Sequence, residues 1–309
     1  MKTLYRTKIF DSQLFNYYCY ELHQKVVLVE MNDISVCTIY AKRKLHLHNL
    51  VKGLMASKLC PDELVVVCMN DRLPNLPATP FAIRSVNIKC DRSVLPLATA
   101  RNKAAAMARG EKLIFLDVDC ISDRNLIGVF NYHLDSEDLL YQGSVRYLHS
   151  DWQKNNWTFT TLQAQSSVNK LQGEAVTGNN RIKHPYELFW SLCFGIRKKT
   201  FFDLGGFDTD YLGYGGEDTD FAFTARSHNL PLYKVSALAY HQFHASYSPP
   251  LNHLAEIVNN ARLFYQKWQI LPMEKWLKKF ADLGYVELKR DRLEIIKYPT
   301  AAEIEQFLI

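Results

Sequence analysis

The sequence lacks three features that would place it in a specialised class of protein. Its seven cysteines include no Cys-x-x-Cys pair, and their odd number offers no disulfide framework, so we expect reduced thiols. No apolar run approaches the roughly 18 residues that a membrane span needs. Residues 1–33 contain no signal-peptide core, and no internal repeat or low-complexity tract is found. These absences argue against a disulfide-rich secreted domain, a membrane-spanning chain and a repeat array, and they predict a cytoplasmic protein.

A strong charge of one sign is missing as well. The formal net charge is +5, from 37 basic and 32 acidic residues. This modest excess suits an anionic small ligand or a peripheral contact with a membrane surface, and it gives no reason to expect nucleic acid. Hydrophobic residues make up 48% of the 309 residues and charged residues 22%. This balance is ordinary for a globular protein, and the length allows one large α/β domain or two modest ones.

The most informative stretch covers residues 113–119 and runs Leu-Ile-Phe-Leu-Asp-Val-Asp. Its unbroken apolar start predicts a strand buried on both faces of a parallel sheet. On an extended backbone Asp117 and Asp119, two residues apart, would point to the same side. Two such carboxylates repel each other unless a cation lies between them, and a hard divalent ion on a phosphorylated ligand is the obvious candidate. The alternative is a solvated loop whose aspartates cap the next helix.

Strand and helix patterns alternate along the chain, which predicts an α/β fold with a mostly parallel central sheet and helices on both faces. Open sheets of this kind bind ligands outside the carboxyl ends of their strands. The expected strands cover 34–40, 64–68, 81–88, 113–119, 139–147, 190–196 and 232–236, and the expected helices cover 47–54, 96–109, 199–204 and 217–228. The polar residues 149–185 predict a long excursion over the site that is mobile until a ligand binds.

A second motif covers residues 205–220, where a glycine-rich loop with aromatic residues leads into the start of a helix. The glycines between residues 213 and 216 would let a ligand approach the backbone closely. The motif ends with three carboxylates, Glu217, Asp218 and Asp220. The preference of acidic residues for a helix N-terminus explains one or two of these carboxylates, but it does not explain why such a loop leads into three.

Other candidate groups follow the expected strands. Arg43 and Asp71 come after the first two strands, at the same edge of the sheet as the aspartate pair. His241 follows the last strand. A lone histidine is usually structural or exposed to solvent, but beside a carboxylate metal site an imidazole from a later loop becomes a reasonable extra ligand.

In their order and spacing, the two motifs resemble the glycosyltransferases of the A-type nucleotide-sugar fold. The chain is most similar to the branch that contains the β-1,4-galactosyltransferases and the bacterial chondroitin polymerases, over residues 34–245. Lys42-Arg43, and Ala100-Arg101-Asn102 before the aspartates, also resemble that branch.

The resemblance implies an inverting, metal-dependent hexosyltransferase that moves a hexose or N-acetylhexosamine from a UDP-sugar to an acceptor hydroxyl. The metal would be Mn²⁺ or Mg²⁺, and the acceptor would be a glycan, a lipid-linked molecule or a small molecule. The animal members are anchored in the Golgi membrane. Without anchor or stem, this chain would be a free-standing bacterial form in polysaccharide or glycoconjugate synthesis, cytoplasmic or peripheral to the inner membrane.

The resemblance also implies roles for particular residues. Those expected at the metal are Asp119, His241 and Asp117, with His241 rather than His244 completing the site. Those expected around the nucleotide are Thr38, Tyr40, Arg43, Asp71, Arg101, Asp117 and Asp119. Those expected at the acceptor are Tyr214, Gly216 and Glu217, with Asp218 as the catalytic base. Tyr214 stands where the galactosyltransferases have a tryptophan, so their acceptor preference does not carry over.

The expected organisation has three parts. They are an N-terminal appendage at 1–33 with an edge strand at 26–29, a catalytic domain at 34–248, and a helical and hairpin extension at 249–309. Within the catalytic domain, 34–120 would form the nucleotide-binding half and 121–248 the acceptor half. The apolar stripes of the extension predict packing rather than a cofactor site.

Two other functions remain open. A metal-dependent nucleotidyltransferase typically needs a glycine-rich, basic loop near its N-terminus, and after the first strand no glycine occurs before Gly53. A non-catalytic nucleotide-sugar-binding domain would have no need for the acidic and imidazole groups together. Sugar transfer uses them directly, because an acceptor hydroxyl needs a base such as Asp218 as it attacks, and a single displacement inverts the anomeric carbon.

Overall fold

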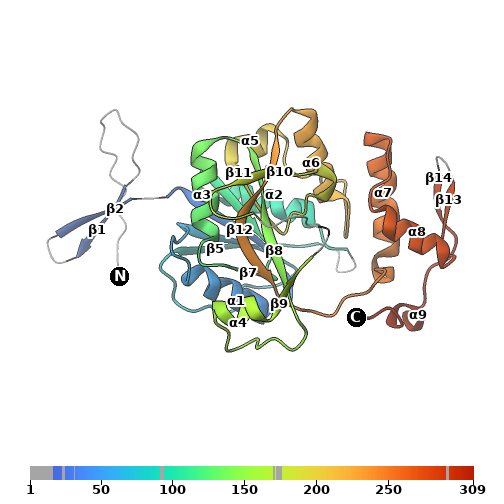
Figure 1. The fold of residues 1–309 in the computed structure, drawn as a ribbon, viewed down its shortest axis with the longest axis horizontal. Coiled ribbons are helices and arrows are strands. Elements are labelled where there is room, and N and C mark those ends of the chain that lie inside the picture. Colours follow the sequence, from blue (N-terminus) through green and yellow to red (C-terminus); the bar gives the residue numbers. More distant parts are fainter. Residues whose placement is uncertain are drawn as a thin grey trace.

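The computed structural model describes residues 17–22, 25–30, 32–90, 94–169, 171, 176–289 and 292–309, and for 17–22, 25–30 and 292 it describes the backbone alone. A ten-stranded sheet forms the centre of the molecule (Figure 1). In spatial order its strands are β10 (Arg181–Lys183), β12 (Leu232–His241), β8 (Leu140–Leu148), β11 (Cys193–Arg197), β6 (Lys112–Leu116), β3 (Ile34–Tyr40), β4 (Glu63–Met69) and β5 (Ala82–Ile88). Two short strands lie off this path, β7 (Cys120–Ser122) on β12 and β9 (Ser166–Val168) on β8.

The long strands of the sheet run mostly in one direction. Strand β3 is parallel to β4 and β6, β4 is parallel to β5, and β12 is parallel to β8. Strand β11 lies antiparallel between β6 and β8, which therefore run the same way. The predicted α/β fold with a mostly parallel sheet is confirmed, and the carboxyl ends of β3, β4, β6, β8 and β12 meet at one edge.

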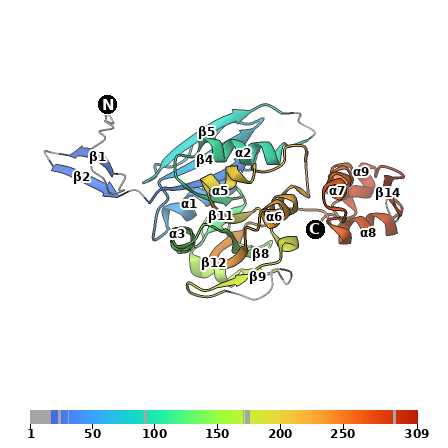
Figure 2. The same cartoon turned by 90° about the horizontal axis from the view of Figure 1, so that it is seen from above.

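Helices cover both faces of the sheet because successive strand residues point to opposite sides. Val36 packs in a core with α1 (Lys44–Met55) and α3 (Leu126–Ser136). The next residue, Cys37, packs in a second core with α2 (Leu97–Met107), α5 (Lys198–Asp203) and α6 (Glu217–Ser227). Figure 2 shows the two helical layers with the sheet between them.

The predicted polar excursion at 149–185 is more structured than expected. It contains α4 (Phe159–Ala164), β9 and β10, and Thr158 caps α4 by accepting a hydrogen bond from the Thr161 N–H. Trp152 and Trp157 are buried in a small core together with Leu162. These tryptophans anchor the first half of the segment. A prediction based on polarity alone does not reveal this anchoring. The mobility of residues 149–185 before ligand binding stays a prediction.

Two strand boundaries differ from the prediction. Strand β12 continues beyond residue 236 to His241, because its second half pairs with both β8 and β7. Strand β11 begins at Cys193 rather than at residue 190. The 3₁₀ turn at Tyr186–Leu188 precedes it.

The C-terminal extension has a core of its own. It comprises a 3₁₀ turn (Leu251–His253), α7 (Leu254–Trp268), α8 (Glu274–Asp282), the hairpin β13 (Val286–Lys289) and β14 (Arg292–Ile295), and α9 (Ala301–Glu305). The predicted helices and hairpin of this extension are confirmed, and residues 290–291, between the two strands of the hairpin, lie outside the described residues.

Near the N-terminus, the expected edge strand is part of β2 (Lys25–Glu30), which pairs antiparallel with β1 (Tyr17–Leu22). Within the described part of the chain, no helix is both long enough and apolar enough to cross a membrane.

Candidate functional site

Pairing between β7 and β12 brings together residues that are far apart in the chain. The register places Cys120 opposite His241. One step further along, the N–H of Gln242 donates to the carbonyl oxygen of Asp119 at 2.7 Å. This antiparallel pairing at the carboxyl edge sets Asp119 beside the end of β12.

Three side chains form a cluster at this edge: Asp119, His241 and His244. One ligand atom from each lies within 4.8 Å of the others, and His244 Nε2 lies 3.6 Å from Asp119 Oδ2. Asp119 Oδ1 is buried and has no hydrogen-bond partner. Burial lowers the pKa of His241 to about 4 despite the opposing field of Asp119, so at neutral pH this imidazole is in the neutral form that binds metals. The donor set suits a divalent cation such as Mn²⁺.

The two aspartates predicted at the metal have different partners in the structure. Strand β6 ends at Leu116, and a turn follows in which the Cys120 N–H donates to the Asp117 carbonyl oxygen at 2.8 Å. The expectation that both aspartates project from one side of an extended strand is therefore wrong. Asp117 Oδ1 lies 3.3 Å from Arg101 Nη2, and Asp117 is not a member of the cluster formed by Asp119 and the two histidines.

Arg101 joins the aspartate turn to the acidic start of α6. Its Nη1 lies 3.0 Å from Glu217 Oε1, and only 5% of the Arg101 side chain and 7% of the Glu217 side chain are exposed. Burial raises the pKa of Asp117, and the guanidinium opposes this rise. Arg101 thus pairs with two carboxylates that lie 100 residues apart in sequence, at positions 117 and 217.

The remaining predicted nucleotide residues lie at the ends of β3 and β4. Arg43 Nη1 contacts Asp119 Oδ2. Asp71 accepts a hydrogen bond from the Lys42 N–H at 2.7 Å, which joins the two strand ends, and a local one from the N–H of the next residue, Arg72, at 2.7 Å. Thr38 and Tyr40 are within β3 and are only 2% and 3% exposed, so they offer little surface to a ligand.

The glycine-rich loop is packed against the C-terminal extension, which was not expected. A Cβ atom at Gly213 would collide with the Glu256 carboxylate, and one at Gly215 would lie 2.7 Å from Met273 Sδ. Both glycines have positive φ, at +72° and +92°. Glu256 of α7 and Met273 therefore occupy the space beside these two glycines, and no open space for a ligand is left there.

Polar contacts reinforce that packing. The Tyr214 N–H donates to Glu256 Oε2 at 2.6 Å. The buried amide of Asn260 donates to the carbonyl oxygens of Leu212 at 3.0 Å and Gly215 at 2.8 Å. Helix α7 thereby holds the backbone of residues 212–215, just before α6 begins.

The predicted acceptor residues lie at the junction between this loop and α6. Gly216 is buried with φ +93° and precedes the first residue of α6. The Tyr214 side chain is 40% exposed, and its ring stacks on His253 with 4.8 Å between centroids. Asp218 is half-buried and accepts a hydrogen bond from the Thr219 N–H at 2.7 Å. Burial and the neighbouring Glu217 carboxylate raise the pKa of Asp218 to about 7.

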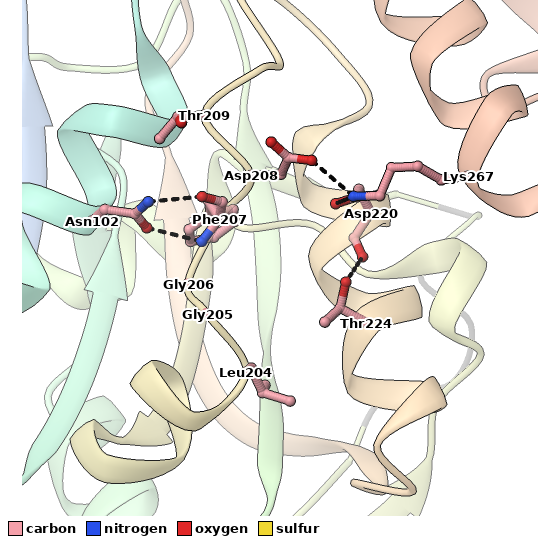
Figure 3. A pocket seen from close by; sticks show the side chains of 10 residues that line it. All are labelled: Asn102, Leu204, Gly205, Gly206, Phe207, Asp208, Thr209, Asp220, Thr224 and Lys267. Atoms are coloured by element: carbon pink, nitrogen blue, oxygen red, sulfur yellow. Dashed lines mark hydrogen bonds and ion pairs between the residues drawn. The ribbon is translucent and has the colours of Figure 1, made fainter.

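Asp220, the third carboxylate of the motif, has a structural role. It lines a pocket of about 420 Å³ that shares no residue with the metal cluster. Figure 3 shows its side chain beside that of Lys267. Its Oδ1 lies 2.7 Å from Lys267 Nζ and accepts hydrogen bonds from Trp268 Nε1 at 2.7 Å and from the Tyr211 hydroxyl at 3.1 Å. Lys267 also lies 2.9 Å from Asp208 Oδ2. This network joins α7 to α6.

Sequence reasoning missed several residues that the fold brings to the site. It set His244 aside, although the spacing of His241 and His244 at the end of a strand was a usable signal. Glu256 and Asn260 carry no comparable signal, because polar residues of an amphipathic helix usually face solvent.

Comparisons with known proteins agree with this arrangement. A family model described as the N-terminal domain of galactosyltransferase matches residues 173–246. A validoxylamine A glucosyltransferase from Streptomyces hygroscopicus subsp. jinggangensis (strain 5008) is 34% identical over 53 residues, which are 17% of this chain and 13% of that protein. The protein of the same name from Streptomyces hygroscopicus subsp. limoneus is 34% identical over 53 residues, 17% of this chain and 12% of that protein.

The sheet, its polar carboxyl edge and the matched domain support a transferase enzyme. More narrowly, the matches support a glycosyltransferase family. The segment matched by the family model contains the glycine-rich loop, Asp218 and both histidines of the cluster.

Proposed function

We propose that this protein is an inverting, metal-dependent glycosyltransferase that moves a hexose or N-acetylhexosamine from a UDP-sugar to an acceptor hydroxyl. One observation carries the proposal. A carboxylate and two imidazoles converge at the carboxyl edge of the sheet, and both imidazoles belong to the segment that matches the galactosyltransferase domain model. The β-1,4-galactosyltransferase and chondroitin polymerase branch remains the best candidate within that family.

Asp119 and His241 are proposed as metal ligands. His244 is an equally good candidate, because its ligand atom lies within 4.8 Å of those of the other two residues. The buried, unpartnered Asp119 Oδ1 supports this assignment, since a buried carboxylate oxygen without a donor needs a cation or a hydrogen bond. Asp117 is the weaker candidate because Arg101 pairs with it. A bound Mn²⁺ or Mg²⁺ would stabilise the negative charge that grows on the departing diphosphate.

Arginines on two sides of the aspartate turn are proposed to bind the nucleotide part of the donor. Arg43 follows β3 and contacts Asp119, and Arg101 on α2 contacts Asp117. A guanidinium can pair with a phosphate through two parallel hydrogen bonds. Asp71 is proposed to shape this side of the site through its bonds to the backbone of residues 42 and 72.

Asp218 is proposed as the general base. A carboxylate whose pKa is raised to about 7 holds a proton more readily than an ordinary aspartate while still being largely ionised in mildly alkaline solution. One base and one displacement give inversion at the anomeric carbon, and a second carboxylate nucleophile is unnecessary. Glu217 is proposed to support the acceptor side through its ion pair with Arg101.

The acceptor is proposed to be a glycan, a lipid-linked molecule or a small molecule in bacterial polysaccharide or glycoconjugate synthesis. The exposed ring of Tyr214 supports an acceptor with an apolar sugar face. In this proposal residues 34–120 bind the nucleotide, 121–248 complete the acceptor side, and a peripheral contact with the inner membrane brings lipid-linked acceptors within reach.

Titration of a panel of nucleotide sugars with and without Mn²⁺, followed by assay of donor breakdown, tests the proposal. We expect one UDP-sugar to bind in the presence of Mn²⁺ and to release UDP slowly in the absence of acceptor. A parallel assay with a nucleoside triphosphate and a sugar 1-phosphate tests the alternative, because a nucleotidyltransferase would join them and release pyrophosphate from the triphosphate. Tight binding without any turnover, with a range of acceptors, would favour a non-catalytic binding domain.

A further inference from the structure

Gln242 is a buried side chain between the two histidines of the metal cluster. It is 1% exposed, so its amide has no access to water. Its backbone N–H donates to the Asp119 carbonyl oxygen at 2.7 Å. Its side-chain Nε2 donates to the His46 carbonyl oxygen at 3.1 Å, and His46 belongs to α1. Gln242 thus holds the backbone around the cluster from inside the protein.

The hydrogen bonds of Gln242 continue to the excursion that follows β8. Gln242 Oε1 accepts from Asn49 Nδ2 at 2.8 Å, and Asn49 Oδ1 accepts from Trp157 Nε1 at 2.9 Å. Asn49 and Trp157 are 4% and 5% exposed. A buried chain of this kind is costly to interrupt, because each lost partner leaves a desolvated polar group unpaired.

We infer that Gln242 is a positioning residue that sets the metal ligands Asp119, His241 and His244 relative to one another. The inference rests on the proposed metal site. The metal would be held by side chains from a turn and from the end of one strand, and neither element by itself fixes the distance between the carboxylate and the imidazoles. The Gln242 N–H ties the turn to that strand end, and the Gln242 amide ties both to α1. Loss of groups that orient metal ligands commonly weakens metal binding by roughly 10–100-fold.

A second buried glutamine provides a matched control. Gln142 is 3% exposed, its Nε2 donates to the carbonyl oxygens of Trp190 at 3.0 Å and Cys193 at 3.1 Å, and its Oε1 accepts from the Trp190 N–H at 3.0 Å. It therefore has the same kind of environment and the same chemistry, without a bond to the cluster. Gln142→Leu and Gln242→Leu should cost similar stability, and only the second should affect metal.

The experiment titrates Mn²⁺ alone into the wild type and both variants by calorimetry, with thermal melts alongside. We expect Gln242→Leu to weaken Mn²⁺ binding by roughly 10–100-fold and Gln142→Leu to leave it unchanged. Should Gln242→Leu not fold, Asn49→Leu replaces it. That variant keeps Gln242 and its bond to the His46 carbonyl oxygen, and it removes the bond to Gln242 Oε1 together with the bonds of Asn49 to Trp157 and to the Lys154 carbonyl oxygen. A smaller loss of Mn²⁺ affinity is expected there.

Each outcome separates the inference from the proposed function. A wild type that binds no Mn²⁺ would overturn the metal site and the inference together. If the wild type binds Mn²⁺ and a folded Gln242→Leu variant binds it with equal affinity, the inference about Gln242 is overturned and the proposed metal site is not. Equal weakening by Gln142→Leu would also overturn it, since the effect would then follow from general loss of stability.

Discussion

The metal cluster and the glycine-rich loop are held in place by different means. The cluster depends on strand pairing, since β7 joins β12 and brings Asp119 beside His241. The loop has no such ladder. Its backbone is held by two side chains of α7, Glu256 and Asn260, which belong to the C-terminal extension. The difference suggests that the donor side of the site is intrinsic to the sheet, whereas the acceptor side depends on the extension.

This contrast has an energetic consequence. Pairing within a large sheet is cooperative and buried on both faces, so the edge that carries the cluster opens only with much of the fold. A loop held by a few side-chain bonds to its backbone N–H and carbonyl groups has a smaller barrier to local opening, because each such bond contributes only about 0.5–1.5 kcal/mol. Substitutions in the two regions should therefore separate metal and donor binding from acceptor turnover.

The largest effect is expected from Asp218→Asn. Removing a general base typically lowers the rate by a factor of about 10²–10⁴, while donor binding in Mn²⁺ should stay nearly unchanged. In the wild type, kcat/KM should rise with pH and level off above about 7, because the base has to be ionised. Steady-state assays of UDP release measure both quantities.

Asp210→Asn is the matched control, since Asp210 is an exposed aspartate of the same loop. It should retain wild-type turnover. Asp218→Asn with wild-type turnover, or a product that keeps the anomeric configuration of the donor, would remove both the base and the single displacement from the mechanism.

The next largest effect is expected from Asp119→Asn. The change keeps the size of the side chain and removes the charge that faces Arg43, His244 and the proposed cation. We expect affinity for UDP in Mn²⁺ to fall by about 2 kcal/mol or more, roughly 30-fold, with the fold intact by circular dichroism. Asp123→Asn, at a carboxylate that bonds to the Asn125 N–H outside the cluster, should leave calorimetric affinity unchanged. Equal affinity of Asp119→Asn and wild type would place the metal elsewhere.

A smaller effect is expected at α7. Asn260→Ala leaves the carbonyl oxygens of Leu212 and Gly215 without their donor, which should cost about 1–3 kcal/mol in the free energy of unfolding and raise the KM for acceptor. UDP affinity in Mn²⁺ should not change. Asn259→Ala, on the exposed side of the same helix, is the control for both urea unfolding and calorimetry. A parallel loss of UDP affinity in Asn260→Ala would show that the two regions are not independent.

Much of the sheet was predictable because its strands have the patterns that burial imposes. The segments around residues 66 and 114 are unbroken apolar runs, and the segment around residue 36 is buried at every position and rich in β-branched residues, as expected for strands covered on both faces. The excursion after β8 was not predictable in the same way. Its first half is anchored by single tryptophans that pack against residues distant in the sequence, and such contacts produce no periodic pattern in the sequence.

The proximity of Asp119 and His241 was predictable, because both residues follow strands whose carboxyl ends meet at one edge of the sheet. Their role as metal ligands stays a prediction. The orientation of Asp117 was not predictable, because a turn replaces the expected strand, and the turn depends on pairing with β12. The glycines of the loop were expected to admit a ligand, whereas Glu256 and Met273 occupy the space beside Gly213 and Gly215. The sequence pattern is the same for a close approach by a ligand and for one by another part of the chain.

The smallest effect expected concerns Asp218 and stability. Its folded-state pKa, about 7, lies above the 3.8 of an ordinary aspartate, because burial and then Glu217 disfavour the charged form. A folded state that holds its proton more tightly than the unfolded chain loses stability as the pH rises between these two values. The amide that Asp218→Asn introduces has no proton to lose, so the stability of this variant relative to wild type should be lowest below about pH 4 and should grow until about pH 7.

Urea unfolding of both proteins at several pH values measures this difference. The gain should be modest, because Asp218 is only half-buried and solvent screens its charge. Asp210→Asn should show no comparable trend if the effect belongs to the buried start of α6. If Asp218 is a base with a raised pKa, Asp218→Asn should be both slower in turnover and more stable than the wild type at alkaline pH. A stability difference that does not change with pH would mean that Asp218 titrates like any surface aspartate.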